Sequence, residues 1–335
     1  MRWAPAHAGR LRSGERLVFA LVFTLMATFV VAITVAAARP PRSFLVAGSA
    51  AGASEQRISG GAVGSSGTGQ SGQGGKQQAD GPVGQVNGPP PLASTRLDAH
   101  LSAALRKVLN SNGGRLAVGV VDKTTGSLAT SHSNRQFRSA SVVTADILAA
   151  LLYQHQQSGT ALTARQADRA VAMVADGNDA ASRRMWRAVG GARGLASANR
   201  ALKLRHTIPG ADGNWALTRT TVSDELQLLT DLTSPQSPLA APARAYELGL
   251  MAGPAADQHW GAYAAGTGRT GYAIKNGSLA YPQLWVVNSI GVVDNDGHVL
   301  LIAVLTSDNA TQAAGIALAS AAAAAAAQVV THADG

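Results

Sequence analysis

A serine at the start of a long apolar helix is the residue whose position best suits covalent chemistry. Ser141 opens the segment Ser141–Gln157, whose apolar spacing predicts a helix. A helix N-terminus presents free backbone N–H groups to an anionic centre. A serine hydroxyl becomes a useful nucleophile only when a base lies within hydrogen-bond reach. Thr144 follows three residues later on the same helical face. Its hydroxyl is no more basic than that of Ser141, so this segment supplies a nucleophile without its base.

Two further segments carry polar side chains that could complete such a site. Asp176–Asn178 opens a predicted helix in the middle of the chain, and Lys275–Ser278 lies on a predicted late strand. Asp176 could pair with Lys275 or accept the proton of Ser141. The alternative is that Asp176 is a solvated helix N-cap, a position for which aspartate is well suited. Lys275 could equally be a surface lysine on an edge strand, and Ser141 a helix-capping serine.

The first elements that position these segments follow from periodicity. Apolar residues at helical spacing predict a helix over Thr95–Leu109. The β-branched run Arg115–Asp122 predicts a strand, and Ser127–Ser131 predicts its hairpin partner. Helical patterns then continue to Leu250. The middle of the chain is therefore predicted to be an all-helical insert.

Strand patterns return in the last third of the chain. The expected turns lie at Asn276–Gly277 and Asp294–Gly297. Two polar residues in an apolar strand, Asn288 and Ser289, are expected to satisfy backbone groups. The strands and the closing Ala-rich helix are predicted over Gly271–Lys275, Trp285–Val293, Val299–Ser307 and Thr311–Val330. Strands at both ends of a helical middle imply one antiparallel sheet with a helical subdomain, an α+β fold, and ligands commonly bind where two such layers meet.

Taken in order, the three polar segments resemble the signatures of the class A β-lactamases and related penicillin-recognising serine enzymes, S-x-x-K, S-D-N and K-T-G. The hairpin sequence VGVVDKTTG and the segments Trp215–Thr218 and Trp285–Gly291 extend the resemblance over nearly the whole chain from Leu92 onward. This resemblance implies an antiparallel five-stranded sheet, flanked by N- and C-terminal helices, with an all-helical subdomain.

The resemblance also implies a role for individual residues. Ser141 matches the nucleophile, and Lys275 matches the lysine that holds the substrate carboxylate and steadies the proton network. Asn178 matches the substrate-contacting asparagine, and Gly277 matches the glycine of K-T-G. The backbone N–H groups of Ser141 and Ser278 match the oxyanion hole. Backbone donors survive most substitutions, so this part of the site is expected to be retained.

The departures from the family pattern concern proton transfer. Thr144 replaces the lysine of S-x-x-K, and Asp176 stands where a proton-relaying serine is expected. Gly177 replaces the aspartate of S-D-N, and Asn276 replaces the threonine of K-T-G. The segment Ala198–Leu217, where class A enzymes keep the glutamate that activates the deacylating water, contains no glutamate. A serine hydrolase fold with impaired catalysis is therefore expected.

Three function classes are compatible with this pattern. The favoured class is a non-hydrolytic domain that binds a cell-wall peptide, a β-lactam-like ligand or a protein partner at the cell envelope. The alternative is a slow or unconventional serine acyl enzyme that uses Ser141, a β-lactam or cell-wall peptide hydrolase or a sensor trapped as an acyl adduct. The third is a purely structural domain in an envelope complex.

The N-terminal part is predicted to anchor the protein in a membrane. Residues 1–16 carry four arginines against one glutamate, which predicts a cytoplasmic N-terminus. Leu17–Ala38 contains no charge and is long enough to cross a hydrocarbon core of about 30 Å. A cleaved signal peptide is the alternative. Residues 39–91 are rich in Gly, Ser, Gln and Pro, which predicts a disordered linker, and residues 92–335 form the β-lactamase-like domain outside the cytoplasm.

Composition narrows the range of ligands. The chain has 335 residues, a formal net charge of +9 and no cysteine, which excludes disulfides and thiolate zinc sites. The eight histidines are scattered without ligand spacing, so neither a metal site nor a cofactor is expected. Basic residues do not cluster with aromatic ones, which argues against nucleic acid. A mildly basic surface facing anionic lipid or wall polymer is expected instead.

Overall fold

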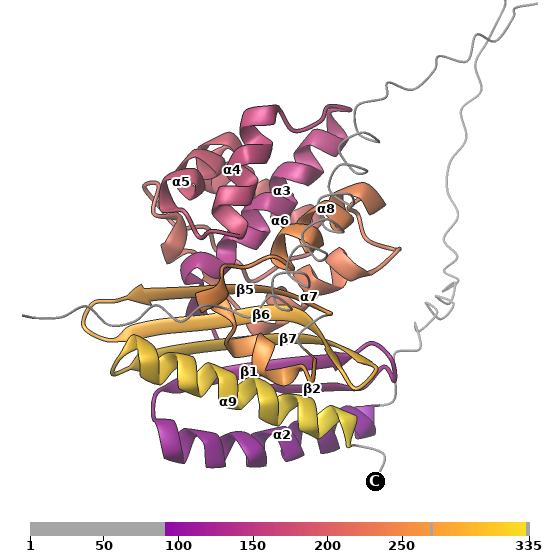
Figure 1. The fold of residues 1–335 in the computed structure, drawn as a ribbon, viewed down its shortest axis with the longest axis vertical. Coiled ribbons are helices and arrows are strands. Elements are labelled where there is room, and N and C mark those ends of the chain that lie inside the picture. Colours follow the sequence, from indigo (N-terminus) through magenta and orange to yellow (C-terminus); the bar gives the residue numbers. More distant parts are fainter. Residues whose placement is uncertain (1–90, 269–270, 333–335) are drawn as a thin grey trace, which may run out of the picture. The chain divides into compact units, whose positions relative to one another are not determined.

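The structure is a computed structural model that describes residues 91–268 and 271–332. Along the described chain a helix is followed by two strands, a mainly helical middle, three strands and a final helix. The N-terminal helix α2 (Pro91–Asn112) and the C-terminal helix α9 (Gln312–Thr331) lie on one side of the sheet, and the helical subdomain lies on the other (Figure 1). The predicted α+β fold is confirmed.

One five-stranded antiparallel sheet separates the two helical layers. Its strand order is β2-β1-β7-β6-β5, so that strand β5 lies at an edge. The strands are β1 (Arg115–Asp122), β2 (Leu128–Ser131), β5 (Tyr272–Ala280), β6 (Trp285–Asn295) and β7 (His298–Asn309). Strand β1 has the bounds that the sequence predicts, and the predicted turn between β6 and β7 falls at Asp296–Gly297.

The predicted turn at Asn276–Gly277 is wrong. Strand β5 runs through both residues to Ala280, and its hairpin turn follows, closed by the hydrogen bond from Tyr281 N to Leu284 O at 2.7 Å. Asn-Gly favours a hairpin turn when both residues take positive φ, and in this structure neither residue does. Asn276 and Gly277 instead pair with Ser289 and Asn288 across the ladder.

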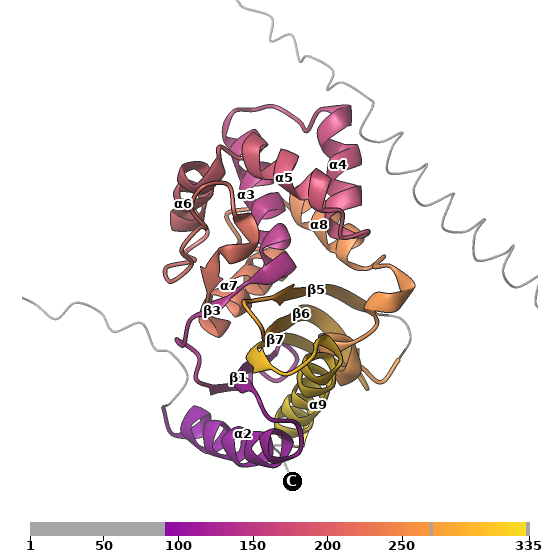
Figure 2. The same cartoon turned by 90° about the vertical axis from the view of Figure 1, so that its left-hand side faces the viewer.

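Six helices form the layer above the sheet. They are α3 (Val143–Gln157), α4 (Ala164–Val174), α5 (Asp179–Ala188), α6 (Gly191–Ala201), α7 (Val222–Thr233) and α8 (Ala241–Met251). Figure 2 shows α3 passing among the others. Every residue from Val143 to Leu152 is buried, so α3 forms the centre of this layer. Side-chain caps start several of the helices, as when Thr163 and Gln166 form a reciprocal capping box at α4.

Short elements connect the layers. The two-residue strands β3 (Phe137–Arg138) and β4 (Arg219–Thr220) pair with each other beside the main sheet. The 3₁₀ helices are η1 (Ala140–Val142), η2 (Trp215–Leu217), η3 (Ala256–Gln258) and η4 (Gly261–Ala265). Of these, η1 leads directly into α3 and carries Ser141, so the predicted helix Ser141–Gln157 is present with a 3₁₀ first turn.

Helix α9 covers the lower face of the sheet with small residues. Its buried face is formed by Leu318 and a series of alanines, packed with α2 against the sheet. Gly315 lets the helix approach β6, because a Cβ there would lie 2.4 Å from a methyl carbon of Val287. Among the described residues, α9 is also the one helix long and apolar enough to cross a membrane. Its packing on the sheet is that of a core helix.

The predicted N-terminal segments lie outside the described residues. These are the cytoplasmic segment 1–16, the membrane anchor Leu17–Ala38 and the linker 39–91 except for its last residue, Pro91, which begins α2. The membrane localisation of the protein therefore stays a prediction.

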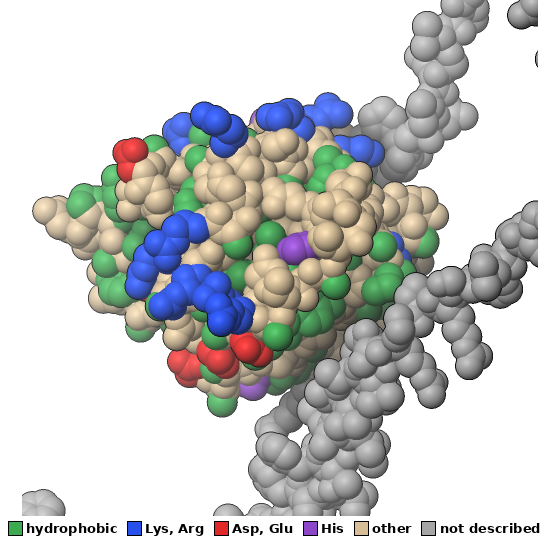
Figure 3. Space-filling view, turned by 90° about the horizontal axis from the view of Figure 1, so that it is seen from above, with side chains coloured by type: hydrophobic (Ala, Val, Ile, Leu, Met, Phe, Trp, Pro, Cys, Tyr) green, Lys and Arg blue, Asp and Glu red, His purple; other side chains and the backbone are tan. Residues whose placement is uncertain are grey.

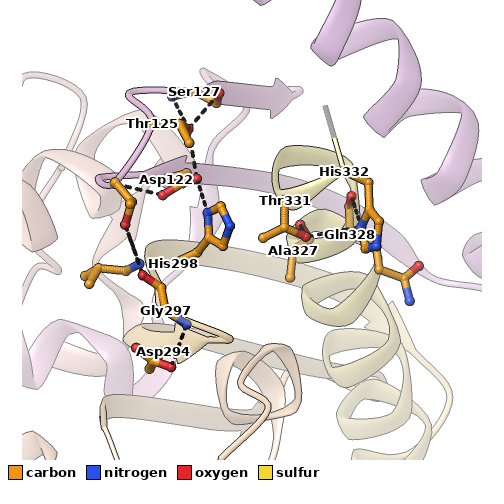
Figure 4. A network of polar contacts seen from close by, with 12 residues as sticks. Asp122, Thr125, Ser127, Asp294, Gly297, His298, Ala327, Gln328, Thr331 and His332 are labelled. Carbon is orange, nitrogen blue, oxygen red and sulfur yellow. Dashed lines mark hydrogen bonds and ion pairs between the residues drawn. The ribbon is translucent and has the colours of Figure 1, made fainter. Parts of the chain in front are cut away.

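A polar network joins β1 to β7 at the end of the sheet (Figure 4). The fully buried Asp122 carboxylate is bonded to His298 Nδ1 at 2.7 Å, accepts from Thr125 Oγ1 at 2.8 Å and accepts from the backbone N–H of Thr124 at 2.8 Å. Burial alone would raise the pKa of Asp122, but the hydrogen bonds from His298, Thr125 and Thr124 together lower it. Every oxygen of this carboxylate is satisfied, which fixes the β1 turn against β7.

Candidate functional site

The backbone immediately before Ser141 is strained. Ala140 has a φ of +49°, in the left-handed region that residues with a Cβ rarely occupy. Such a conformation costs about 1–3 kcal/mol and persists only where the surroundings enforce it. Here the enforcing group is Asn288 of β6, whose Nδ2 donates to Arg138 O at 2.7 Å and to Ser139 O at 3.0 Å. The sheet therefore holds the chain in the bend that presents Ser141.

Gly277 allows β5 to lie against the serine. A Cβ at this position would lie 2.5 Å from the amide nitrogen of Ser141 and 2.6 Å from that of Val142. Contacts that short are forbidden, so a glycine is required where strand and η1 meet. An edge strand also presents backbone N–H groups with no partner strand. The predicted oxyanion donors, the amides of Ser141 and Ser278, come from these two adjoining segments.

A cavity of about 200 Å³ opens beside Ser141. Six of the residues selected from the sequence line it: Ser141, Asp176, Lys275, Asn276, Gly277 and Ser278. Its remaining walls come from residues that sequence reasoning missed, among them Asp257, Gln258 and Gln312, which belong to no recognisable motif. Two selected residues, Thr144 and Asn178, are not part of the lining. Residues from the three polar segments thus line one cavity.

Thr144 faces its own helix. Its side chain is 1% exposed, and Oγ1 donates to the carbonyl oxygen of Ser141 at 2.8 Å. Within the described part of the chain, Ser141 Oγ makes no hydrogen bond to a protein group. The position three residues after the serine therefore holds no base and points no group at the serine hydroxyl.

Lys275 is a buried cation without a counter-ion in the part of the chain that the structure describes. Its side chain is 6% exposed, which corrects the alternative of a surface lysine, and Nζ donates to Asn276 O at 3.0 Å. It has no carboxylate within 4.0 Å among the described residues, where ion pairs are formed by Arg115, His206 and His298. Burial lowers the pKa of Lys275 to about 8.

The polar residues of the loop between α4 and α5 have roles that differ from those expected from the sequence. Asn178 is the N-cap of α5, with Oδ1 accepting from the amide of Ala181 at 2.9 Å. The N-cap role considered for Asp176 is therefore wrong, because the helix begins at Asp179. Asp176 is exposed and lines the cavity, and within the described chain it forms no ion pair with Lys275.

The other K-T-G positions are held by hydrogen bonds. Asn276 Nδ2 donates to Gln258 O at 2.7 Å, and its Oδ1 accepts from Ser289 Oγ at 2.6 Å. Ser278 Oγ accepts from Gln312 Nε2 at 2.9 Å. These bonds fasten β5 to the η3 loop on one side and to α9 on the other. The expectation that Asn288 and Ser289 satisfy backbone groups is confirmed, since Ser289 Oγ also accepts from the amide of Ala262 at 2.7 Å.

No group of three or more His, Cys, Asp or Glu side chains is placed to hold a metal ion in residues 91–268 and 271–332. The cavity therefore combines a serine hydroxyl at a strained bend, adjoining backbone amides, one buried ammonium and two aspartates. This set can bind an anionic ligand and orient an acyl group beside Ser141.

The fold described above is that of the class A β-lactamases and penicillin-recognising serine hydrolases. It consists of five strands with α2 and α9 below, a helical subdomain above and a serine where the layers meet. A β-lactamase from Streptosporangium roseum superposes with a TM-score of 0.60 at 18% identity, covering 70% of this chain and 99% of that protein. A β-lactamase from Xanthomonas campestris gives 0.59 at 18%, covering 70% and 98%.

A reconstructed ancestor points to the same class. A variant of the ancestral class A β-lactamase of Gram-negative bacteria has a TM-score of 0.56 at 19% identity, covering 67% of this chain and 96% of its own. Comparison with models of protein families and with curated proteins gives no match. The fold thus agrees with the family that the sequence motifs resemble. At sequence identities this low, the comparison supports the fold alone.

Proposed function

We propose that this chain is a membrane-anchored β-lactamase-like protein of the cell envelope that binds a carboxylate-bearing acyl ligand, a β-lactam or a cell-wall peptide, with little or no hydrolysis. The observation that carries the proposal is the orientation of Thr144. Its hydroxyl donates to Ser141 O and lies outside the cavity, whereas the cavity itself keeps its serine and its lysine.

Binding is supported by the uncompensated charge of Lys275. A buried ammonium is costly unless it is paired, and among the described residues this one has a single hydrogen-bond partner, Asn276 O. The carboxylate of a ligand in the cavity would supply the missing partner. An anion beside Lys275 would also raise the pKa of that lysine from about 8, so binding is expected to take up protons near neutral pH.

Slow turnover is supported by the missing base. General acid–base catalysis typically contributes about 10²–10⁴ in rate. Thr144 cannot supply it, and the segment Ala198–Leu217 offers no glutamate for a deacylating water. Asp176 remains a proposed alternative base, because it lines the cavity and its carboxylate is free of ion pairs within the described chain.

A second candidate function, slow acylation of Ser141, is favoured by one observation. Lys275 lines the same cavity, and with a pKa of about 8 roughly one tenth of it is neutral at pH 7. In that step the neutral Nζ of Lys275 takes the proton of Ser141 Oγ while the oxygen attacks the ligand's carbonyl carbon. The lactam C–N bond then breaks, and its nitrogen takes the proton from Lys275 Nζ, which leaves the lysine neutral again.

Intact mass and calorimetry separate these functions. The full-length protein and Ser141→Ala are incubated with benzylpenicillin, and both samples are also titrated with it. Saturable heat without added mass is the result expected for binding. A mass increase equal to one penicillin, absent in Ser141→Ala, identifies the acyl enzyme. A folded protein that shows neither heat nor added mass would overturn the proposal and leave a structural role.

A further inference from the structure

Two carboxylates in the cavity are unused by the binding of an anionic acyl group. Asp176, from the loop between α4 and α5, and Asp257, from η3, both line the cavity. Both are exposed, and neither forms an ion pair or a side-chain hydrogen bond within residues 91–268 and 271–332. Both carboxylates are therefore accessible to a ligand in the cavity, whereas Lys275 is buried.

A backbone contact joins the two loops that carry these aspartates. The amide of Ala255 donates to the carbonyl oxygen of Ala175 at 3.3 Å. Ala175 directly precedes Asp176, and Ala255 lies two residues before Asp257. The hydrogen bond therefore connects the loop between α4 and α5 to the segment that leads into η3, and it joins the two segments that carry Asp176 and Asp257.

The acidic rim, which consists of Asp176 and Asp257, contrasts with the surface around it. Lys and Arg side chains gather in several groups on the face above the helical subdomain (Figure 3). The exposed arginines of α4, α5 and α6 include Arg165, Arg183, Arg184, Arg187 and Arg193. Asp176 and Asp257 both line the cavity, and neither has an arginine partner in the described chain, so they offer negative charge to a cation in the cavity.

The chemistry of the rim favours an organic ammonium over a metal ion. Ca²⁺ takes about six to eight oxygen ligands and Mg²⁺ about six in strict geometry. Two exposed carboxylates from separate loops supply too few of them, in keeping with the absence of a metal-binding group among the described residues. An ammonium has three N–H donors and is satisfied by two carboxylates and water.

We propose that Asp176 and Asp257 bind the amino group of a zwitterionic ligand, so that the cavity selects amine-bearing acyl compounds over matched compounds without the amine. This inference rests on the proposed binding function, because it places the ligand's carboxylate at Lys275. Charge complementarity is then complete: an anion contacts the buried ammonium, and a cation contacts the exposed carboxylates.

Ampicillin and benzylpenicillin test the selection, because they differ by one amino group. Their dissociation constants are measured by calorimetry on the full-length Ser141→Ala protein at pH 6.5 and low salt. Ampicillin is expected to bind about fivefold to tenfold more tightly, since exposed ion pairs are individually weak. Asp176→Asn and Asp257→Asn should each lower the affinity for ampicillin and raise that for benzylpenicillin, whose carboxylate the aspartates repel.

Asp179→Asn is the matched control. Asp179 is exposed and only three residues from Asp176, but it does not line the cavity. It should leave the ratio of the two affinities unchanged. Equal affinities in the parent protein, or an equal loss of selectivity in all three Asn variants, would overturn the inference while leaving the proposed function standing.

The failure of both penicillins to bind is a distinct outcome. It would overturn the proposed function, and the rim is then tested alone by titrating 6-aminohexanoate against hexanoate. A preference for the amino compound that disappears in Asp176→Asn still supports the rim as an ammonium site. No preference in that pair overturns the inference as well.

Discussion

The two layers that meet at the cavity treat their buried polar groups in opposite ways. On the sheet side, Asp122, Asn276, Asn288 and Ser289 all direct their side chains to hydrogen-bond partners. In the helical subdomain, several buried acceptors have no partner among the described residues. They are Asp146 Oδ1, Asn199 Oδ1, Glu225 Oε2, Asp231 Oδ2 and both carboxyl oxygens of Glu247.

The carboxyl pKa values follow this division. Hydrogen bonds hold the pKa of Asp122 below its usual value. Burial raises the pKa of Asp146 to about 7, that of Glu225 to about 8 and that of Glu247 well above its usual value. Repulsion between carboxylates adds to these three shifts, because Asp224 acts on Asp146 and Glu225, and Asp146 acts on both glutamates. The buried polar groups of the sheet named above therefore have hydrogen-bond partners, whereas the helical subdomain contains carboxyl groups that are partly neutral at physiological pH.

Ser141 lies where the sheet and the helical subdomain meet. The sheet fixes the bend before it through Asn288. The helix after it enters the layer of unpaired acids, with Asp146 five residues further on. Helix α3 carries no lysine or arginine. The buried carboxyls lie in the same helical layer, so the lack of positive charge and the excess of buried acids concern the same region. Restoring or removing charge there tests the comparison directly.

The largest effect is expected from Thr144→Lys. A lysine at this position gives Ser141 an adjacent base and gives the buried acids of the helical layer a cation. Acylation by benzylpenicillin should accelerate by about 10²–10⁴, followed as intact mass against time. Thr144→Met, similar in length but uncharged, should stay slow. A folded Lys variant no faster than the Met variant would refute the assigned role of this position.

The pH dependence of the unfolding free energy tests the buried acids of the helical layer. The pKa values of Asp146 and Glu225 are raised in the folded state, so their contribution is complete below the unfolded pKa near 4 and is lost as pH rises through 7 to 8. Between pH 5 and 8 the loss corresponds to about two pKa units for Asp146 and about two and a half for Glu225. At about 1.4 kcal/mol per unit, the expected loss is on the order of 6 kcal/mol. Urea unfolding at the two pH values measures it.

Glu247→Gln should reduce this pH dependence. Glu247 is fully buried, its pKa is raised by burial and by Asp146, and glutamine keeps its shape without a charge. The stability difference between pH 5 and 8 should therefore shrink in the variant. Asp212→Asn, a change at an exposed loop residue, serves as the control and should leave it unaltered. An unchanged difference in Glu247→Gln would mean that the buried acids are not the source.

Asn288→Ala should break the sheet's hold on Ser141. It removes the Asn288 donor from the carbonyls of Arg138 and Ser139 and the Asn288 acceptor from the amide of Thr306, while Ser139 O keeps the amide of Val142 at 3.3 Å. Each unsatisfied buried group costs about 1–3 kcal/mol, so a loss on the order of 3–5 kcal/mol in unfolding free energy is expected. Benzylpenicillin binding should weaken as well, because the bend at Ala140 is released.

Asn309→Ala provides the comparison for that variant. Asn309 donates to Trp285 O at 2.9 Å and to Thr306 Oγ1 at 2.8 Å, away from the lining of the cavity. It should destabilise the sheet while leaving ligand affinity in the folded protein intact. If both variants lose affinity in proportion to their stability, Asn288 has no special positioning role.

Much of this architecture was predictable because its signals are local. The β-branched run of β1 has a period that its own residues set, and helix α9 begins one residue after the predicted Thr311, which is its N-cap. The turn at Asn276–Gly277 failed because a distant contact decides it. Gly277 is required by the closeness of Ser141, and Asn276 by the carbonyl of Gln258.

The residues of the candidate site also divide into those that the sequence predicted and those that it did not. Ser141 and Lys275 carry family motifs and were found, whereas Asp257 and Gln312 lie in segments whose sequence has no distinguishing pattern. Nothing local indicates that Glu225 and Glu247 are buried, because their burial depends on how α7 packs against the sheet and α8 against α3. Motifs therefore identify the residues of a site, and the packing of separate elements determines their environment.

The smallest expected effect belongs to the satisfied half of the molecule. Asp122→Asn removes the charge that His298 and two hydrogen-bond donors stabilise, at an expected cost of about 1–3 kcal/mol at pH 7. The pKa of Asp122 is lowered in the fold, so its stabilisation is present above the unfolded pKa and disappears as pH falls through the folded value. The stability gap between the parent protein and Asp122→Asn should therefore narrow from pH 7 to pH 3, measured by urea unfolding. A gap that stays constant over this range would show that the network acts by shape alone, and the contrast with the titrating acids of the helical layer would lose its electrostatic basis.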